Sequence, residues 1–181
     1  MAIPESSLRK SALRKCMRQL LPDAPPDPRP VCSALDSWLK GQPNIRTLAV
    51  FSALPGEVCL LGFIANHPEI HRAYPRVLGD HLIFHIVKNP QTDLLPGNFG
   101  ISEPSSNLPE IPASEIDAFL CPGLAFDATG GRLGRGKGFY DRILATARLG
   151  ALKIGVCFPW QLVPDTFSEP HDVHMDRIIC G

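Results

Sequence analysis

Apolar side chains near the N-terminus of this chain recur every three or four positions, which is the period of an amphipathic helix. The pattern comprises Leu8, Ala12, Leu13, Cys16, Met17 and Leu20. We predict a helix over residues 5–21 that ends before Pro22. A second amphipathic stretch predicts a helix over 31–40 that ends at Gly41. On the first helix we expect Leu13, Met17 and Leu20 to pack on the sheet.

Short apolar runs separated by turn residues predict strands that alternate with helices. We expect a buried strand that runs into a loop over 45–54, strands at 71–77, 81–87, 116–126, 152–158 and 176–180, and helices at 58–66 and 137–149. The run 116–126 is apolar on both faces, as in a central strand. This alternation predicts a three-layer α/β/α domain with a mixed sheet.

One domain is expected over residues 1–181, since domains commonly hold about 150 residues. The first 21 residues form its basic amphipathic helix. Residues 89–115 contain five prolines and little periodicity, so we expect a long ordered loop or flap there.

Charge, apolar runs and cysteine spacing together exclude several classes of protein. The 18 basic residues equal the 18 acidic ones, which excludes a strongly cationic nucleic-acid coat. No stretch approaches the length of a membrane span, and the N-terminus lacks the apolar core of a secretory signal. The six cysteines form no C-x-x-C pair, and most lie in apolar company. We expect free thiols and a cytoplasmic location.

The most informative segment is the glycine-rich stretch 129–141, which lies between a predicted strand and a predicted helix. Five of the nine residues 130–138 are glycine, and three are the cations Arg132, Arg135 and Lys137. Glycines let backbone N–H groups converge on an anion, and a helix N-terminus adds partial positive charge. The segment therefore predicts a polyphosphate site.

Local chemistry leaves other interpretations of this loop open. Gly131, Gly136 and Lys137 have the spacing of a P-loop, but Gly138 stands where Ser or Thr should hold magnesium. A small-molecule kinase is thus one alternative. A flexible surface loop and an RNA-binding basic tract are others, although only Phe139 and Tyr140 offer stacking surfaces.

Carboxylates suited to magnesium occur beside the loop and near the C-terminus. Asp141 follows the loop, and Asp172 and Asp176 belong to the cluster 171–176. A solvated loop, or a zinc site from His171 and His174, are alternatives for this cluster.

Three further features have ordinary structural interpretations. Lys10, Arg14 and Arg18 share one helical stripe, which by default is a solvated face. Glu57 follows a Pro-Gly turn and is either a site residue or a cap. His85 is expected to be a structural histidine of its strand.

The stretch PGLAFDATGGRLGRGKGFYDRIL resembles the signature of the 5-formyltetrahydrofolate cyclo-ligase family. Weaker elements resemble that family in the same order along the chain. They are Lys10-Ser-Ala-Leu13-Arg14, Leu54-Pro55-Gly56-Glu57-Val58, Tyr74-Pro75-Arg76-Val77, Gly100-Ile101-Ser102-Glu103-Pro104, and His171-Asp172 with Asp176. The family usually has Tyr-Tyr-Asp where this chain has Phe139-Tyr140-Asp141.

The resemblance implies ATP-dependent cyclisation of 5-formyltetrahydrofolate to 5,10-methenyltetrahydrofolate, with release of ADP and phosphate through a phosphorylated formyl intermediate. It also implies a Rossmann-like fold of the ribose-5-phosphate isomerase and CoA-transferase type. A binding paralogue without this activity is the alternative. The implied partners are small molecules, reduced folate and ATP with Mg²⁺, for a monomer that binds neither nucleic acid nor membrane.

The resemblance also implies roles for individual residues. Asp141 and Asp172 would hold magnesium, and Arg135 and Lys137 are the candidate catalytic residues. The ATP-binding set would be Lys10, Arg14, Arg132, Leu133, Gly134, Arg135, Gly136, Lys137, Gly138, Phe139 and Tyr140. The folate-binding set would be Glu57, Phe99, Arg135, Gly136, Lys137, Gly138 and Phe139.

Overall fold

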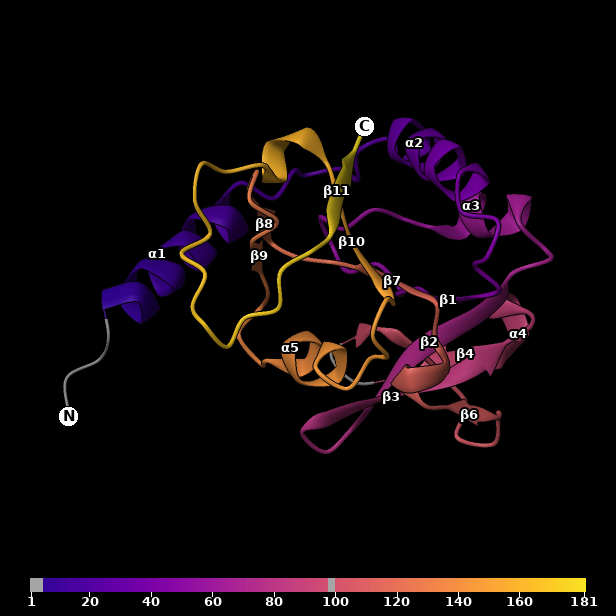
Figure 1. Cartoon of the computed structure of the whole chain (residues 1–181). Helices are drawn as coiled ribbons and strands as arrows, with labels where there is room; N and C mark the ends of the chain where they lie inside the picture. The colour runs from indigo at the N-terminus through magenta and orange to yellow at the C-terminus, as the bar shows by residue number, and fades with distance from the viewer. Residues whose placement is uncertain (1–4, 98–99) are drawn as a thin grey trace.

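A seven-stranded sheet forms the centre of the molecule, in the order β11-β10-β7-β1-β2-β3-β6 (Figure 1). The computed structural model describes residues 5–97 and 100–181. Neighbouring strands from β11 to β2 are parallel, whereas β3 and β6 pair antiparallel. The strands are β1 (Thr47–Ala49), β2 (His71–Leu78), β3 (His81–Val87), β6 (Glu110–Ile111), β7 (Ala118–Cys121), β10 (Leu152–Cys157) and β11 (Arg177–Cys180).

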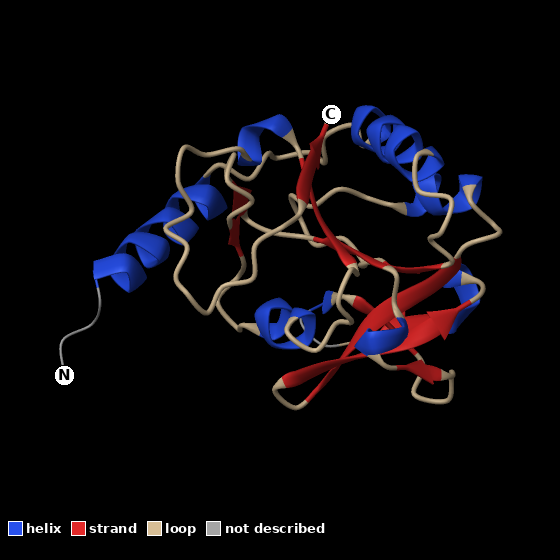
Figure 2. Ribbon diagram, viewed as in Figure 1, coloured by secondary structure: helices blue, strands red, loops and turns tan. Residues whose placement is uncertain are grey.

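Helices cover both faces of this sheet, which confirms the three-layer prediction (Figure 2). On one face, α2 (Arg29–Lys40) and α3 (Leu61–Asn66) pack with Leu48 and Val50 of the β1 region. On the other, α5 (Phe139–Leu144) packs with the cluster that contains Ala49. Because strand side chains alternate, adjacent residues of one strand contribute to two different cores.

The segment expected as a long loop contains short elements. They are α4 (Pro90–Asp93), β4 (Leu94–Pro96), β5 (Ser102–Pro104), β6 and the 3-10 helix η2 (Ala113–Glu115). β4 and β5 form a hairpin, and β6 adds an edge to the main sheet. The five prolines keep each element short without preventing pairing.

Two elements end well before the residue that the apolar pattern predicts. The strand expected over 116–126 is β7 followed by a separate hairpin of β8 (Ala125–Phe126) and β9 (Arg132–Leu133), because Pro122 has no N–H with which to continue the ladder. The helix expected over 137–149 ends at Leu144, and Leu149 is fully exposed. No helix within 5–97 and 100–181 is long and apolar enough to cross a membrane.

The N-terminal helix α1 (Glu5–Gln19) packs on the β8–β9 hairpin rather than on the main sheet (Figure 1). Met17 is buried there against Leu124 and Leu133. The expectation that Leu13, Met17 and Leu20 pack on the main sheet was wrong, because Leu13 and Met17 pack on the hairpin and Leu20 is 56% exposed. The hairpin offers too narrow a surface to cover the whole apolar stripe.

A buried carboxylate, Asp127, fixes the start of the glycine-rich loop. Its Oδ1 accepts hydrogen bonds from the backbone N–H groups of Thr129 (2.9 Å) and Gly131 (3.0 Å), and also from the Thr129 hydroxyl. Its Oδ2 accepts from the N–H and hydroxyl of Thr166. Burial alone would raise the pKa of Asp127, but these hydrogen bonds outweigh it and hold the pKa well below its usual range.

We predict that Asp127→Asn lowers the free energy of unfolding by about 2–3 kcal/mol at pH 7, because the new NH₂ group faces donors. The depressed pKa of Asp127 means that its stabilisation is present above the unfolded-state pKa of about 3.9 and is lost as the pH falls. The difference between variant and wild type should therefore shrink below about pH 4.

Urea unfolding at several pH values measures this difference, with the exposed Asp23→Asn as control. An equal difference at pH 7 and pH 3 would contradict the assignment.

Candidate functional site

A cleft of about 990 Å³ opens at the carboxyl ends of β1 and β7. In open α/β sheets this edge is where ligands bind. Its walls come from α1, the segment after β1, the β2–β3 hairpin, the glycine-rich loop, α5 and the segment 169–172. Regions far apart in the sequence therefore meet around one volume.

The glycine-rich loop forms one wall with a backbone that requires glycine. Gly136 has φ +99° and Gly138 has φ +66°, a region that side chains disfavour. Arg14 Nε donates to the carbonyl oxygen of Gly134 at 3.0 Å, so α1 supports this loop across 120 residues. The structure thus turns the Lys10–Arg14 face of α1 toward the loop.

Lys10 is buried at the end of the cleft, with 6% exposure. Its ammonium donates to Glu169 Oε2 at 2.7 Å and to Asp172. Burial by itself would lower the pKa of Lys10, but its hydrogen bonds to Asp172 and Glu169 outweigh that effect and raise it. Lys10 is therefore a fully charged group facing the cleft, already paired with two carboxylates.

Arg132 is the second buried cation. It is 8% exposed and forms an ion pair with Asp141 at 3.0 Å, and its guanidinium lies 5.2 Å from the centre of the Tyr140 ring. It also donates to the Pro122 carbonyl at 3.3 Å. Arg132 and Asp141 thus join the loop to the first turn of α5.

Arg135 crosses the cleft to Glu57, on the segment that follows β1. Its Nε and Nη2 both lie 3.1 Å from Glu57 Oε1. Glu57 Oε2 accepts from the Leu54 N–H at 3.0 Å. Burial raises the pKa of Glu57, although the Leu54 hydrogen bond and Arg135 oppose this shift.

Lys137 differs from the other loop cations because it is exposed. No hydrogen-bond or ion-pair partner for its ammonium is found among residues 5–97 and 100–181. It lines the cleft and is available to an anion. Phe139 also lines the cleft, and the Arg142 guanidinium lies 5.6 Å from its ring centre.

The remaining predicted residues have different places. Gly134, Gly136 and Gly138 line the cleft with their backbones. Leu133 also reaches the cleft, but its side chain is buried against Met17. Phe99 lies outside the described residues.

The carboxylates expected to bind metal are each held by a cation, Asp141 by Arg132 and Asp172 by Lys10. Within the described residues, one cluster offers three donor atoms within 4.8 Å of one another: Glu169, His171 and Asp172. His174 is not part of it and instead contacts the Thr129 carbonyl. Asp176 accepts from the Lys153 N–H beside the sheet.

Three buried or half-buried acids were missed by sequence reasoning. Glu169 binds Lys10, Asp127 fixes the loop, and Glu103 lies in the cleft wall. Asp127 and Glu103 occur within motifs that carried the family resemblance, and Glu169 is two residues from His171. No spacing rule marks them, because their partners are distant in sequence.

The cleft has two chemically different halves. Cations from α1, the glycine loop and α5 surround one half, as a polyphosphate requires. Apolar side chains line the other half, including Phe51, Pro75, Val77, Leu82 and Ile101. Such a surface suits a flat ring system, with Glu57 and Glu103 as its polar groups.

Comparisons with known proteins identify the family that this chain resembles in sequence. Residues 67–181 match the model of the 5-formyltetrahydrofolate cyclo-ligase family. A 5-formyltetrahydrofolate cyclo-ligase from Mycolicibacterium smegmatis is 31% identical over 97% of this chain and 92% of its own. One from Mycoplasma pneumoniae is 29% identical over 97% of both chains.

Solved structures show the same likeness. A 5,10-methenyltetrahydrofolate synthetase from Mycoplasma pneumoniae superposes with a TM-score of 0.76 at 27% identity, covering 94% of this chain and 97% of that one. One from Aquifex aeolicus gives 0.79 at 30% identity, covering 94% and 89%.

Proposed function

The chain belongs to the 5-formyltetrahydrofolate cyclo-ligase family, and from this premise we propose that the two-part cleft is its active site. The family reaction converts 5-formyltetrahydrofolate and ATP to 5,10-methenyltetrahydrofolate, ADP and phosphate. One observation carries the proposal: a single cleft joins a cationic glycine loop to an apolar wall that contains the buried Glu57.

The chemistry requires two substrates in contact. The formyl oxygen attacks the γ-phosphorus, the bond to the β,γ-bridging oxygen breaks, and ADP leaves. The second folate nitrogen then attacks the activated formyl carbon and loses its proton to solvent or to the departing phosphate, the carbon–oxygen bond breaks, and phosphate leaves. Phosphoryl transfer of this kind depends on positioning and charge neutralisation rather than on a nucleophilic side chain.

The glycine loop and α1 would hold the polyphosphate. Lys137 is free to neutralise charge on the transferring phosphate, while Arg132 and Arg135 are already fixed by Asp141 and Glu57. Arg14, which is held at the loop by Gly134, presents a planar fork suited to two phosphate oxygens.

The folate ring would lie on the apolar half. Glu57 would accept hydrogen bonds from the ring, and Arg135 holds its carboxylate in place. Phe139 keeps an aromatic surface at the junction of the two halves.

The donor set fits a magnesium ion, because carboxylate oxygens are the ligands that this cation prefers. Asp172 and Asp141 would hold it, with Glu169 as a third carboxylate near Asp172. Asp141 lies outside the cluster of Glu169, His171 and Asp172, so it would reach the ion from the other side of the cleft. When bound, the ion supplies positive charge to the phosphate oxygens. Lys10 contacts Asp172 and Glu169 and would remain beside them as a phosphate ligand.

A cytoplasmic location is part of the proposal. All six cysteines are free thiols. Burial raises the pKa of the Cys121 thiol to about 12, which keeps it protonated and unreactive. Reduced, buried cysteines of this kind support a reducing compartment.

The first prediction concerns the reaction itself. The purified chain should form 5,10-methenyltetrahydrofolate, followed by its absorbance, only when 5-formyltetrahydrofolate, ATP and Mg²⁺ are all present. One phosphate should be released for each product formed. Stable transfer of phosphate to the folate, with no ring closure, would instead identify a kinase.

Lys137→Ala should slow turnover by about 100-fold or more, because it removes the unpaired cation of the loop. Steady-state rates at saturating substrates measure this effect. Lys40→Ala, on α2 and away from the cleft, is the matched control. Turnover within a fewfold of wild type would remove Lys137 from the mechanism.

Arg14→Ala should weaken ATP binding by about 1.5–3 kcal/mol, the range for charge-assisted hydrogen bonds. The melting temperature of the free protein should change little, since Arg14 makes one hydrogen bond to Gly134. Calorimetric titration with ATP decides this, with the exposed Arg9→Ala of the same helix as control. Unchanged affinity would make Arg14 a structural support of the loop only.

A further inference from the structure

Glu103 is a second buried carboxylate of the cleft, and none of the reaction steps described above uses it. It is 4% exposed, and its Oε1 accepts one long hydrogen bond, from the Val77 N–H at 3.3 Å. Within residues 5–97 and 100–181, no cation lies within ion-pair distance of it and no donor reaches its Oε2. The nearby Arg76 donates instead to the Pro104 carbonyl.

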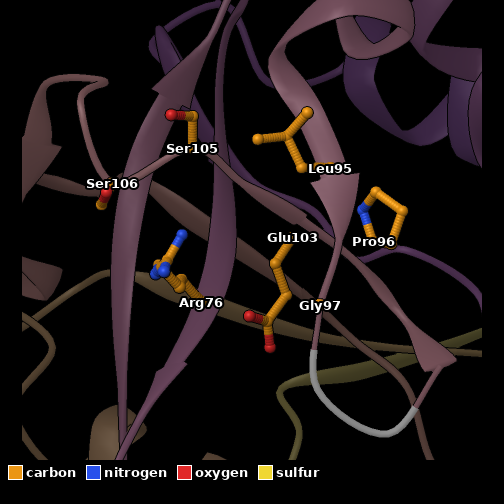
Figure 3. A pocket seen from close by; sticks show the side chains of 7 residues that line it. All are labelled: Arg76, Leu95, Pro96, Gly97, Glu103, Ser105 and Ser106. Atoms are coloured by element: carbon orange, nitrogen blue, oxygen red, sulfur yellow. The ribbon is translucent and has the colours of Figure 1, made fainter.

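The topology of the sheet explains how Glu103 reaches the cleft. β1 pairs with β2 only as far as Ala73, and Val77 lies four residues farther along β2. Glu103, on β5, therefore occupies the edge of β2 beyond the carboxyl end of β1. It lines both the cleft and a second cavity of about 380 Å³, whose lining residues are drawn in Figure 3.

The backbone of Gly97 packs against the Glu103 side chain and fixes its position (Figure 3). A Cβ atom at Gly97 would lie 2.5 Å from the Glu103 Cγ and 2.7 Å from its Oε2. Only glycine at position 97 leaves room for this side chain. The carboxylate therefore lies against the backbone that follows β4 and within hydrogen-bond distance of Val77 on β2. A buried carboxylate with one weak partner is costly unless further donors reach it.

The apolar half of the cleft indicates what could supply those donors. Phe51, Pro75, Leu82 and Ile101 surround the volume beside Glu103. Glu57, the other carboxylate there, already has both oxygens bound, by Arg135 and by the Leu54 N–H. Glu57 Oε1 accepts two N–H groups of Arg135 and its Oε2 accepts one from Leu54, so Glu57 has room for a single further donor. In Glu103 both oxygens have open acceptor positions, so it can receive two adjacent donors.

The reduced pterin ring of a folate carries a ring N–H and an exocyclic 2-amino group side by side. Two adjacent parallel donors match the two oxygens of one carboxylate. Resting on the proposed function, we propose that Glu103 binds this edge of the pterin and so selects a 2-amino-4-oxo ring. A ring without the amino group would leave a buried carboxylate oxygen unpaired, which is the strongest form of discrimination.

The test compares two ligands on two proteins without ATP. The ligands are 5-formyltetrahydrofolate and its analogue with hydrogen in place of the 2-amino group, and binding is followed by protein fluorescence. Glu103→Gln should weaken binding of 5-formyltetrahydrofolate by about 10- to 100-fold. Wild type should disfavour the analogue by a similar factor, whereas Glu103→Gln should bind both ligands within about threefold.

The variant is expected to fold, because a Gln carbonyl oxygen can still accept from Val77. Ser105→Ala, which borders the small cavity but not the cleft, is the matched control and should bind both ligands as wild type does. If Glu103 had only a structural role, Glu103→Gln would weaken binding of both ligands equally and would keep the wild-type preference between them. That result would overturn the proposal. So would unchanged binding in Glu103→Gln.

This outcome is separable from that of the proposed reaction. Ligand discrimination that depends on Glu103 in a protein that forms no methenyltetrahydrofolate would contradict the reaction and support pterin recognition. Normal product formation by Glu103→Gln, with unchanged KM for the folate, would support the proposed reaction and contradict pterin recognition by Glu103.

Discussion

Compensation of buried charge is the constraint on which this cleft depends. Lys10 is paired with Asp172 and Glu169, Arg132 with Asp141, and Arg135 with Glu57. An isolated charge of this degree of burial would be strongly destabilising, so each cation requires its carboxylate before any ligand is present. The pairs span up to 162 residues of sequence and so bring the two ends of the chain to the same edge of the sheet.

The paired arginines and the exposed lysine of the loop are suited to different tasks, the first to positioning a substrate and the second to neutralising its charge. A paired guanidinium is held in one geometry, and preorganised charges of this kind need no rearrangement when the substrate charge develops. In the proposed reaction an exposed lysine would instead follow the phosphate as it moves. Lys137 would then have a different task from Arg132 and Arg135, although the three are equivalent in the sequence pattern. The zero net charge of the chain conceals this local concentration of cations.

Sequence patterns predicted the parts of the fold that local physics controls. The α2 helix, the β2–β3 hairpin and the loop between strand and helix follow from periodicity and turn residues. The exposure of Leu20 and the early end of α5 did not, because each depends on how much surface another element offers. The sequence predicted an anion site at the glycine loop, but it did not mark Asp127, Glu169 and Glu103. The role of each carboxylate depends on donors that are distant in the sequence, so no local spacing pattern predicts it.

The two halves of the cleft are linked through one ion pair. Arg135 belongs to the glycine loop, yet its guanidinium binds Glu57 on the apolar side. Burial raises the pKa of Glu57 and Arg135 opposes that rise, so the charge of Glu57 depends on where Arg135 lies. A polyphosphate that attracts Arg135 would reduce this support, and a ring donor that binds Glu57 would replace it. Under the proposed function each ligand would alter the same pair, so occupation of one half would change the electrostatics of the other, which is how linked binding arises in a site of fixed backbone.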